Sequence, residues 1–281
     1  MNFHTLTAKQ VAAYTEFLRA EERTAATVEK YSRDIRAFAE WLEKRPVTKE
    51  TVARWKEQLM QDSFSPSTVN AKLSAVNGLL RFLGWNECRV KFVKVQKRIF
   101  RDASRDLNRD EYQRLLSTAR MLGRERLELL LETICATGIR VSEVKYITVE
   151  AAKNGRTDVS LKGKVRTILL PAKLCRKLLK YAKKQNAVSG EIFLSGNGTG
   201  LSRVQIWRGM KQICKAAGVE PSKVFPHNLR HLFATTFYRA TKDIAKLADI
   251  LGHSSINTTR IYLLTTDAEH VRCLERLGLV S

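Results

Sequence analysis

The stretch PHNLRHLFAT, residues 226–235, contains the polar pair on which the interpretation of this chain depends. Pro226 suits the first turn of a helix, so we expect His227 and Arg230, three residues apart, to project from one face near the helix N-terminus. Backbone N–H groups and a guanidinium at such a helix end form a good phosphate site. A capping histidine beside a solvated arginine is the alternative, and the pair alone does not decide between them.

A second arginine in an unusual setting lies upstream, in TGIRVSEV at residues 137–144. Gly138 is expected to end a helix in the left-handed conformation, which leaves Arg140 just after it among apolar neighbours. A buried guanidinium without an anion is costly, so Arg140 needs a negative partner. That partner is either a bound anion or Glu143, one turn further on.

Two further stretches complete the set. LGHSSINTTRIY, residues 251–262, contains His253 and Tyr262, but a histidine after glycine is usually a cap and a tyrosine among aliphatic residues is usually core. Between residues 158 and 170 the period changes from helical to alternating, which predicts two short strands around a tight turn at Gly163. The stretch KGKVR lies at that turn.

TGIRVSEV, KGKVR, PHNLRHLFAT and LGHSSINTTRIY occur in this order, and together they resemble the tyrosine site-specific recombinase, or phage integrase, family. The resemblance covers nearly the whole chain and implies an N-terminal helical core-binding domain, a linker and a catalytic domain. The catalytic residues that it implies are Arg140, Lys162, His227, Arg230, His253 and Tyr262. The hairpin is one residue shorter than the family's usual Lys-Gly-x-Lys turn, so Lys164 is an alternative to Lys162.

The resemblance implies that DNA strands are cleaved and rejoined without ATP or another cofactor. Arg140 and Arg230 would hold the non-bridging phosphate oxygens, and Tyr262 would attack to form a 3′-phosphotyrosine. Lys162 would protonate the departing 5′-oxygen.

The histidines have smaller implied roles, and a metal has none. His227 would help to move the tyrosine proton, and His253 would donate a hydrogen bond to the phosphate. Two-metal nucleases need clustered carboxylates, whereas residues 151–250 hold only five, which are scattered along the chain. We therefore predict metal-free chemistry.

The N-terminal part of the chain reads as four helices. Apolar residues recur at spacings of three and four in residues 27–45 and 65–84, and weaker helical patterns occupy about 6–21 and 48–61. These patterns predict a small four-helix domain over residues 1–88. The resemblance implies that this is the SAM-like core-binding domain. The polar residues expected off the helix cores include Lys30, Arg33, Arg36, Asn70, Lys72 and Asn77.

The remainder divides into three parts. Residues 89–106 lose the helical period and gather Lys and Arg, which indicates a basic linker, with a pair of strands as the alternative. Asn108 is a candidate N-cap in a mixed catalytic domain, mainly helical around one small hairpin, over residues 107–266. Residues 267–281 predict a tail helix too short to be stable alone. It docks on its own domain or, as the resemblance suggests, on a neighbouring subunit.

Charge points to the partner. Fifty Lys and Arg against 28 Asp and Glu leave a net charge of +22, and residues 151–250 alone carry 20 basic and five acidic residues. Such clustering indicates a polyanion, most simply nucleic acid, although a basic surface that serves only solubility is the alternative. The resemblance implies that this partner is duplex DNA. Lys30, Arg33 and Lys72 are the candidate DNA contacts of the first domain.

Composition excludes several classes of protein. No apolar run approaches the roughly 18 residues of a membrane span, and the N-terminus resembles no secretory signal. The five cysteines are scattered without Cys-x-x-Cys spacing, which argues against a disulfide framework or a zinc knuckle. We expect reduced thiols and a cytoplasmic protein.

The main hypothesis is a recombinase that acts as a homotetramer on paired DNA sites, with or without accessory proteins. A catalytically silent DNA-binding regulator of the same fold and a monomeric type IB topoisomerase are the alternatives. The complete set of six residues favours an enzyme, because a protein that only binds DNA needs neither Tyr262 nor Lys162.

Overall fold

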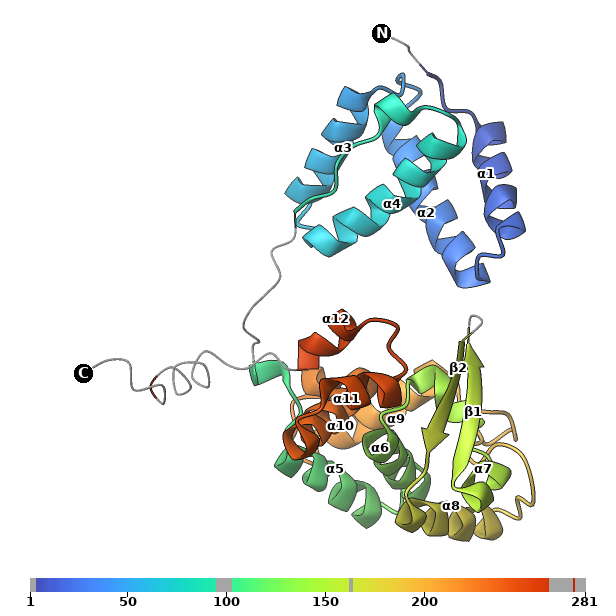
Figure 1. The fold of residues 1–281 in the computed structure, drawn as a ribbon, viewed down its shortest axis with the longest axis vertical. Coiled ribbons are helices and arrows are strands. Elements are labelled where there is room, and N and C mark those ends of the chain that lie inside the picture. Colours follow the sequence, from blue (N-terminus) through green and yellow to red (C-terminus); the bar gives the residue numbers. More distant parts are fainter. Residues whose placement is uncertain (1–3, 95–102, 162–163, 263–274, 276–281) are drawn as a thin grey trace. The chain divides into compact units, whose positions relative to one another are not determined.

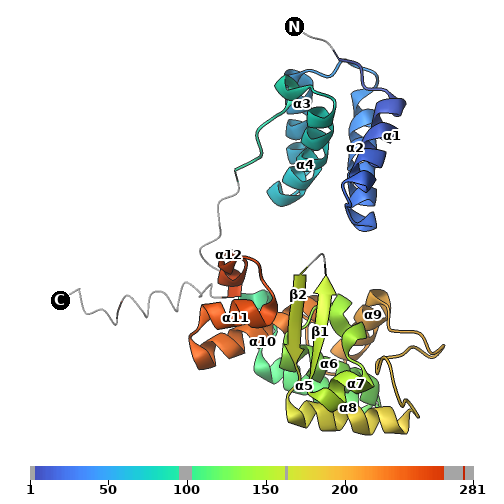
Figure 2. The ribbon, with the colours of Figure 1, turned by 45° about the vertical axis from the view of Figure 1, so that its right-hand side comes forward.

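The computed structural model describes residues 4–94, 103–161, 164–262 and 275. The chain forms two compact units, Met1–Lys97 and Arg98–Ser281, shown in Figure 1 and, turned by 45°, in Figure 2. Helices dominate both units, and the strands of the described residues form one two-stranded sheet in the second unit. The predicted fold class, mainly helical with a small hairpin, is confirmed.

The described residues of the first unit form four α-helices, as predicted. They are α1 (Ala8–Ala20), α2 (Ala25–Leu42), α3 (Lys49–Gln61) and α4 (Pro66–Phe82). Each begins after a threonine or serine whose hydroxyl accepts a backbone N–H of the first turn, which satisfies a donor that the helix leaves free. The helices enclose a core in which the rings of Phe38 and Trp55 meet edge to face, 5.0 Å apart.

The segment after α4 is held against that helix by two asparagines that we expected off its core. The buried Asn77 donates to the Val90 carbonyl at 2.9 Å and accepts the Val90 N–H at 3.2 Å. Asn70 makes the same pair of bonds with Val93, at 2.9 and 2.8 Å. Residues 90–93 therefore run alongside α4 within the first unit, which differs from the predicted start of the linker at residue 89. The side-chain amides replace the backbone ladder that a neighbouring strand would supply.

The second unit packs helices around the hairpin and a shared apolar core. Its elements are α5 (Arg109–Met121), α6 (Glu125–Thr137), α7 (Val149–Asn154), β1 (Arg156–Leu161), β2 (Lys164–Leu169), α8 (Ala172–Lys184), α9 (Arg203–Cys214), α10 (Pro226–Thr241), α11 (Ile244–Leu251) and α12 (Ile256–Thr259). Helix α10 lies against α6, and α11 against α10. This arrangement brings the ends of α6 and α11 to the side of α10.

Local signals set several of these boundaries. Asn108 caps α5 in a capping box with Glu111, and α6 ends at Gly138 with φ +64°, both as predicted. In the antiparallel hairpin Val159 lies opposite Arg166, and Val159 and Ile168 are buried. The predicted turn at Gly163 lies outside the described residues, as does the predicted tail helix 267–281 apart from Glu275.

Two predictions from composition can be compared with the described part of the chain. None of its helices is long and apolar enough to cross a membrane. Its four cysteines, Cys88, Cys135, Cys175 and Cys214, are free thiols, three of them buried. Cys273 lies outside the described residues.

Replacing Asn77 by alanine should lower the free energy of unfolding of the first unit by about 2–4 kcal/mol, because two buried backbone groups of Val90 lose their partner. Asn70→Ala is the matched control, since its two bonds are only partly buried and water can replace the amide. Urea unfolding followed by tryptophan fluorescence measures both losses, because Trp41, Trp55 and Trp85 lie in this unit. Equal losses in the two variants would contradict the assignment.

Candidate active site

A polar cluster forms in the second unit where four segments meet. Arg140 follows α6, Arg230 lies in the second turn of α10, His253 follows α11, and Tyr262 lies in the short 3₁₀ turn after α12. Each of the helices α6 and α11 ends at a glycine with positive φ, Gly138 and Gly252, so the chain turns sharply and delivers the next polar residue to the cluster.

Arg230 occupies the centre of the cluster. Its side chain is 3% exposed and donates to the Gly138 carbonyl, to the Leu251 carbonyl at 2.8 Å and to Nε2 of His253 at 3.0 Å. Both carbonyls lie at helix C-terminal ends, where the backbone leaves acceptors free and carries partial negative charge. Burial, followed by the nearby Arg140, lowers the pKa of Arg230 from its ordinary value, and Tyr262 opposes this shift. The ends of α6 and α11 therefore hold one buried cation.

Arg140 has one of the two partners that the sequence left open, Glu143. Its backbone N–H and Nη1 both donate to the buried Glu143 carboxylate at 2.8 Å, and Nη2 reaches the Gly252 carbonyl at 3.4 Å. The salt bridge is thus confirmed. The side chain nevertheless stays 40% exposed, so Glu143 fixes the guanidinium without enclosing it. Arg140 can still meet an anion from solution.

His253 is a neutral acceptor in this arrangement. Arginine can only donate, so Nε2 of His253 accepts from Arg230, and the ring proton sits on Nδ1, which donates to Thr259 Oγ1 at 2.8 Å. Burial, and then the charges of Arg230 and Arg140, lower the pKa of His253 to about 4. The hydrogen bond to phosphate that the family resemblance implies therefore requires a proton on Nε2 that this ring does not carry here.

Tyr262 is both a core residue and a member of the cluster. It is 4% exposed and packs with Leu247 and Leu251. Its ring stacks with that of His253 at 5.9 Å and lies 5.0 Å from that of His231. The Tyr262 ring therefore lies beside His253, which in turn bonds the positively charged Arg230.

The structure says less about the other predicted catalytic residues, His227 and the hairpin lysine. His227 is exposed in the first turn of α10, and its charge contributes to the lowered pKa of His253. Lys162 lies outside the described residues, and Lys164 begins β2. The structure therefore brings together five of the six predicted residues: Arg140, His227, Arg230, His253 and Tyr262.

Sequence reasoning missed Arg166. The side chain of this β2 residue is 9% exposed. Its Nη1 donates to the Leu251 carbonyl at 2.7 Å and lies 3.4 Å from Oε2 of Glu143. Burial lowers the pKa of Arg166 to about 10. The attraction of Glu143 opposes this shift, and the repulsion of Arg230 and Arg140 adds to it. Its position opposite the apolar Val159 was a weak signal, because charged residues on a two-stranded hairpin usually face solvent.

The candidate DNA contacts of the first unit lie on α2 and α4. Lys30 and Arg33 are exposed on α2, one turn apart. Arg33 Nε and Lys72 Nζ lie 3.9 and 3.6 Å from Oδ1 of the buried Asp34. The carboxylate therefore gathers cations of two helices, and the mostly buried Lys72 also supports the fold.

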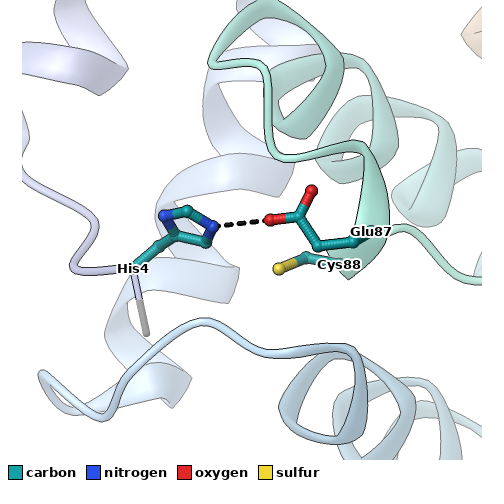
Figure 3. A group of neighbouring side chains, drawn as sticks. All are labelled: His4, Glu87 and Cys88. Carbon is teal, nitrogen blue, oxygen red and sulfur yellow. Dashed lines mark hydrogen bonds and ion pairs between the residues drawn. The ribbon is translucent and has the colours of Figure 1, made fainter. Parts of the chain in front are cut away.

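One group of described side chains has the donor types for a metal, and it lies in the first unit (Figure 3). The donor atoms of His4, Glu87 and Cys88 lie within 4.8 Å of one another. His4 Nε2 hydrogen-bonds Glu87 at 2.7 Å, its ring stacks on Trp85 at 4.4 Å, and Cys88 Sγ donates to the Val47 carbonyl at 3.5 Å. These contacts by themselves account for the cluster as an anchor of the N-terminal segment.

Comparison with known families identifies the family to which this two-unit chain belongs. Residues 105–269 match the model of the phage integrase family, and residues 11–87 match that of the phage integrase N-terminal SAM-like domain. The chain belongs to the phage integrase family. The family's catalytic-domain model thus covers the whole polar cluster from Arg140 to Tyr262.

Relatives of this integrase-family chain match along most of their length. Tyrosine recombinase XerA of Pyrococcus furiosus is 28% identical over 292 residues, which cover 100% of this chain and 98% of the relative. Tyrosine recombinase XerD of Bifidobacterium longum is 30% identical over 268 residues, covering 84% and 86%.

Solved structures agree on the fold. The XerH recombinase bound to its difH substrate superposes with a TM-score of 0.69 at 21% identity, covering 95% of this chain and 84% of that one. A lambda integrase tetramer bound to a Holliday junction gives 0.74 at 19% identity, covering 93% and 78%. Both units of this chain thus have the fold of tyrosine recombinases.

The His253 arrangement predicts a specific pH dependence. Nitrogen NMR of the DNA-free protein should find His253 neutral at pH 6 with its proton on Nδ1. An unfolded histidine titrates near about 6.5, so the unfolded chain binds this proton first as the pH falls. The stability contributed by the neutral ring is complete above that pH and is lost as the pH falls towards 4. His253→Gln should flatten the dependence in denaturation at several pH values; a ring that is protonated at pH 6 would contradict the arrangement.

Proposed function

We propose that this chain is a site-specific DNA recombinase that cleaves and rejoins duplex DNA through a 3′-phosphotyrosine, for integration, excision or transposition of a DNA element. The observation that supports this proposal is that the buried Arg230 connects His253 and Tyr262 in one cluster with Arg140. Arg230 bonds His253, whose ring stacks on that of Tyr262, and Arg140 lies beside them with its side chain partly exposed. Fixed cations beside a phenol are the parts that phosphoryl transfer at a phosphodiester requires.

The proposed chemistry uses only groups of this chain and the DNA. Arg140 and Arg230 hold the non-bridging oxygens, whose negative charge grows in the transition state. The Tyr262 oxygen forms a bond to phosphorus while the bond to the 5′-oxygen breaks. Lys162 gives its proton to the departing 5′-oxygen, and the phosphotyrosine conserves the bond so that a 5′-hydroxyl later reverses the step.

The histidines complete the proposal. His227, at the exposed start of α10, helps to accept the tyrosine proton. A phosphate in contact with Arg230 competes with its bond to His253, and the phosphate's negative charge raises the pKa of the imidazole. His253 then takes up a proton and becomes the donor to the phosphate that it is not in the free protein.

The partners follow from the same proposal. The net charge of +22 suits duplex DNA, with Lys30, Arg33 and Lys72 as candidate contacts in the first unit. The lambda integrase of known structure forms a tetramer on a Holliday junction, and we propose a homotetramer on paired sites for this chain as well. We further propose that this chain acts on its DNA substrate in the cytoplasm. Joined products from two DNA molecules, as opposed to relaxation alone, distinguish recombination from topoisomerase activity.

Tyr262→Phe should abolish covalent attachment to DNA and leave duplex binding nearly unchanged, because only a hydroxyl is lost while the basic surface remains. A denaturing gel detects the adduct, and a mobility-shift assay measures binding. An adduct that persists in the variant would make another residue the nucleophile, with Tyr238, which packs against the same apolar cluster, as the first candidate. A wild-type protein that binds DNA but forms no adduct would instead indicate a silent regulator.

Lys162, and not Lys164, is proposed as the general acid. A DNA substrate with sulfur in place of the 5′-bridging oxygen has a leaving group that needs no proton, so it should restore cleavage by Lys162→Ala. Cleavage of ordinary DNA should fall by about 100-fold or more in that variant. Sulfur rescue of Lys164→Ala, with Lys162→Ala fully active on ordinary DNA, would reverse the assignment.

We also propose that residues 267–281 dock on a neighbouring subunit of the tetramer. Deleting them should weaken cooperative assembly on paired sites and alter cleavage, because the tail begins five residues after Tyr262. A single protomer should still fold and bind one half-site. Truncated protein that unfolds, or that assembles and recombines like the full chain, would contradict docking between subunits.

A further inference from the structure

The cluster contains one buried cation that the proposed chemistry does not use. Arg166 Nη1 bonds the Leu251 carbonyl, while its Nε and Nη2 are buried without a hydrogen-bond partner among the described residues. Burying an incompletely paired guanidinium is unfavourable, and an apolar side chain in such a place often stabilises a protein. For folding alone, an apolar side chain at this position would serve at least as well as an arginine.

The partners of Arg166 are shared with the residues that hold phosphate in the proposed mechanism. The Leu251 carbonyl accepts from both Arg166 and Arg230, at 2.7 and 2.8 Å. Glu143 lies 3.4 Å from Arg166 and also bonds Arg140. The stem of Arg166 packs against Gly252, where an added Cβ would lie 2.3 Å from its Cδ. Arg166 therefore touches the groups that position Arg140, Arg230 and the turn before His253.

The same side chain belongs to the hairpin. The sheet has only two strands, and such a hairpin is marginally stable unless it is packed against something. Val159 and Ile168 are buried, whereas Val165, which follows Lys164 at the start of β2, is 72% exposed. After the pair Val159–Arg166, two residue pairs remain in the register, and Lys162 follows Leu161, the last residue of β1. Among described side chains, Arg166 is thus the buried anchor nearest to that end of the hairpin.

We propose that Arg166 is a positioning residue that ties the β1–β2 hairpin, and with it the general-acid lysine, to the cluster of Arg140, Arg230 and His253. The proposal rests on the proposed function. Without the tie, the hairpin shifts away from the scissile phosphate, and transfer of the lysine proton to the 5′-oxygen slows. Attack by Tyr262 and the hold of the two arginines on the phosphate are affected less, because Glu143 and the helix ends still fix both arginines.

The test compares two DNA substrates, one ordinary and one with sulfur at the 5′-bridging position. In the second, the phosphorus–sulfur bond breaks and the thiolate departs without a proton. Arg166→Met keeps the length of the stem and removes the charged head. It should cleave ordinary DNA about 100-fold more slowly than the wild type and cleave the sulfur substrate at a rate within about threefold of it. Arg166→Lys cannot bond both partners at once, so it should show the same pattern with a smaller loss.

Arg156→Met is the matched control. It removes an exposed arginine from the far end of the same hairpin, so the ratio of the two cleavage rates should stay that of the wild type. Thermal melting and a mobility-shift assay on one half-site establish that each variant is folded and binds DNA. If Arg166→Met does not fold, the comparison is made with Arg166→Lys.

The outcomes separate the two proposals. Equal losses on both substrates would overturn the positioning role, because Arg166 would then act on the phosphate or on the fold. Undiminished cleavage of ordinary DNA by both variants would overturn it as well. A wild-type protein that cleaves neither substrate would instead refute the proposed function.

Discussion

The second unit depends on the guanidinium of Arg230, which joins the C-terminal ends of α6 and α11 from its place on α10. Free carbonyls at a helix end need donors, and a buried cation needs acceptors, so each satisfies the other. Two glycines make the contact possible. An added Cβ at Gly138 would lie 2.4 Å from Phe233, and one at Gly252 would meet Arg166. Loss of this joint would separate Arg140, His253 and Tyr262, which come from three different segments.

The cluster has an excess of positive charge that its own residues do not neutralise. Glu143 is the buried carboxylate that pairs with Arg140 and Arg166 and attracts Arg230. Burial, and then the charges of the three arginines, lower the pKa of His253 and favour its neutral form. Mutual repulsion of fixed cations is unfavourable in the free protein and is relieved when an anion binds among them. A phosphodiester is such an anion. The free protein thus contains a site with excess positive charge, and in the proposed function His253 is the member whose protonation state a bound phosphate changes.

The first unit shows the same use of polar side chains inside the fold. Asn70 and Asn77 bond the backbone of residues 90–93, and Asp34 holds Arg33 and Lys72 on adjacent helices. Arg33, Asn70, Lys72 and Asn77 were expected off the helix cores, because a polar residue off the apolar stripe usually faces water. Except for the contact between Arg33 and Asp34, which are neighbours on α2, their partners come from other segments of the chain, so periodicity within one helix carries no sign of them.

The sequence by itself determined the helices, their caps, the hairpin and the identity of the candidate residues, because period, capping residues and motif order are local properties. Asn108, Gly138 and the alternation through Val159 and Ile168 are of this kind. Only the tertiary structure decided that Arg140 pairs with Glu143 while staying partly exposed, that His253 accepts from Arg230, and that the mostly buried Arg166 side chain contacts Glu143 and the Leu251 carbonyl. Protonation state and burial depend on the field and packing of segments distant in sequence, and these act only after the chain has folded.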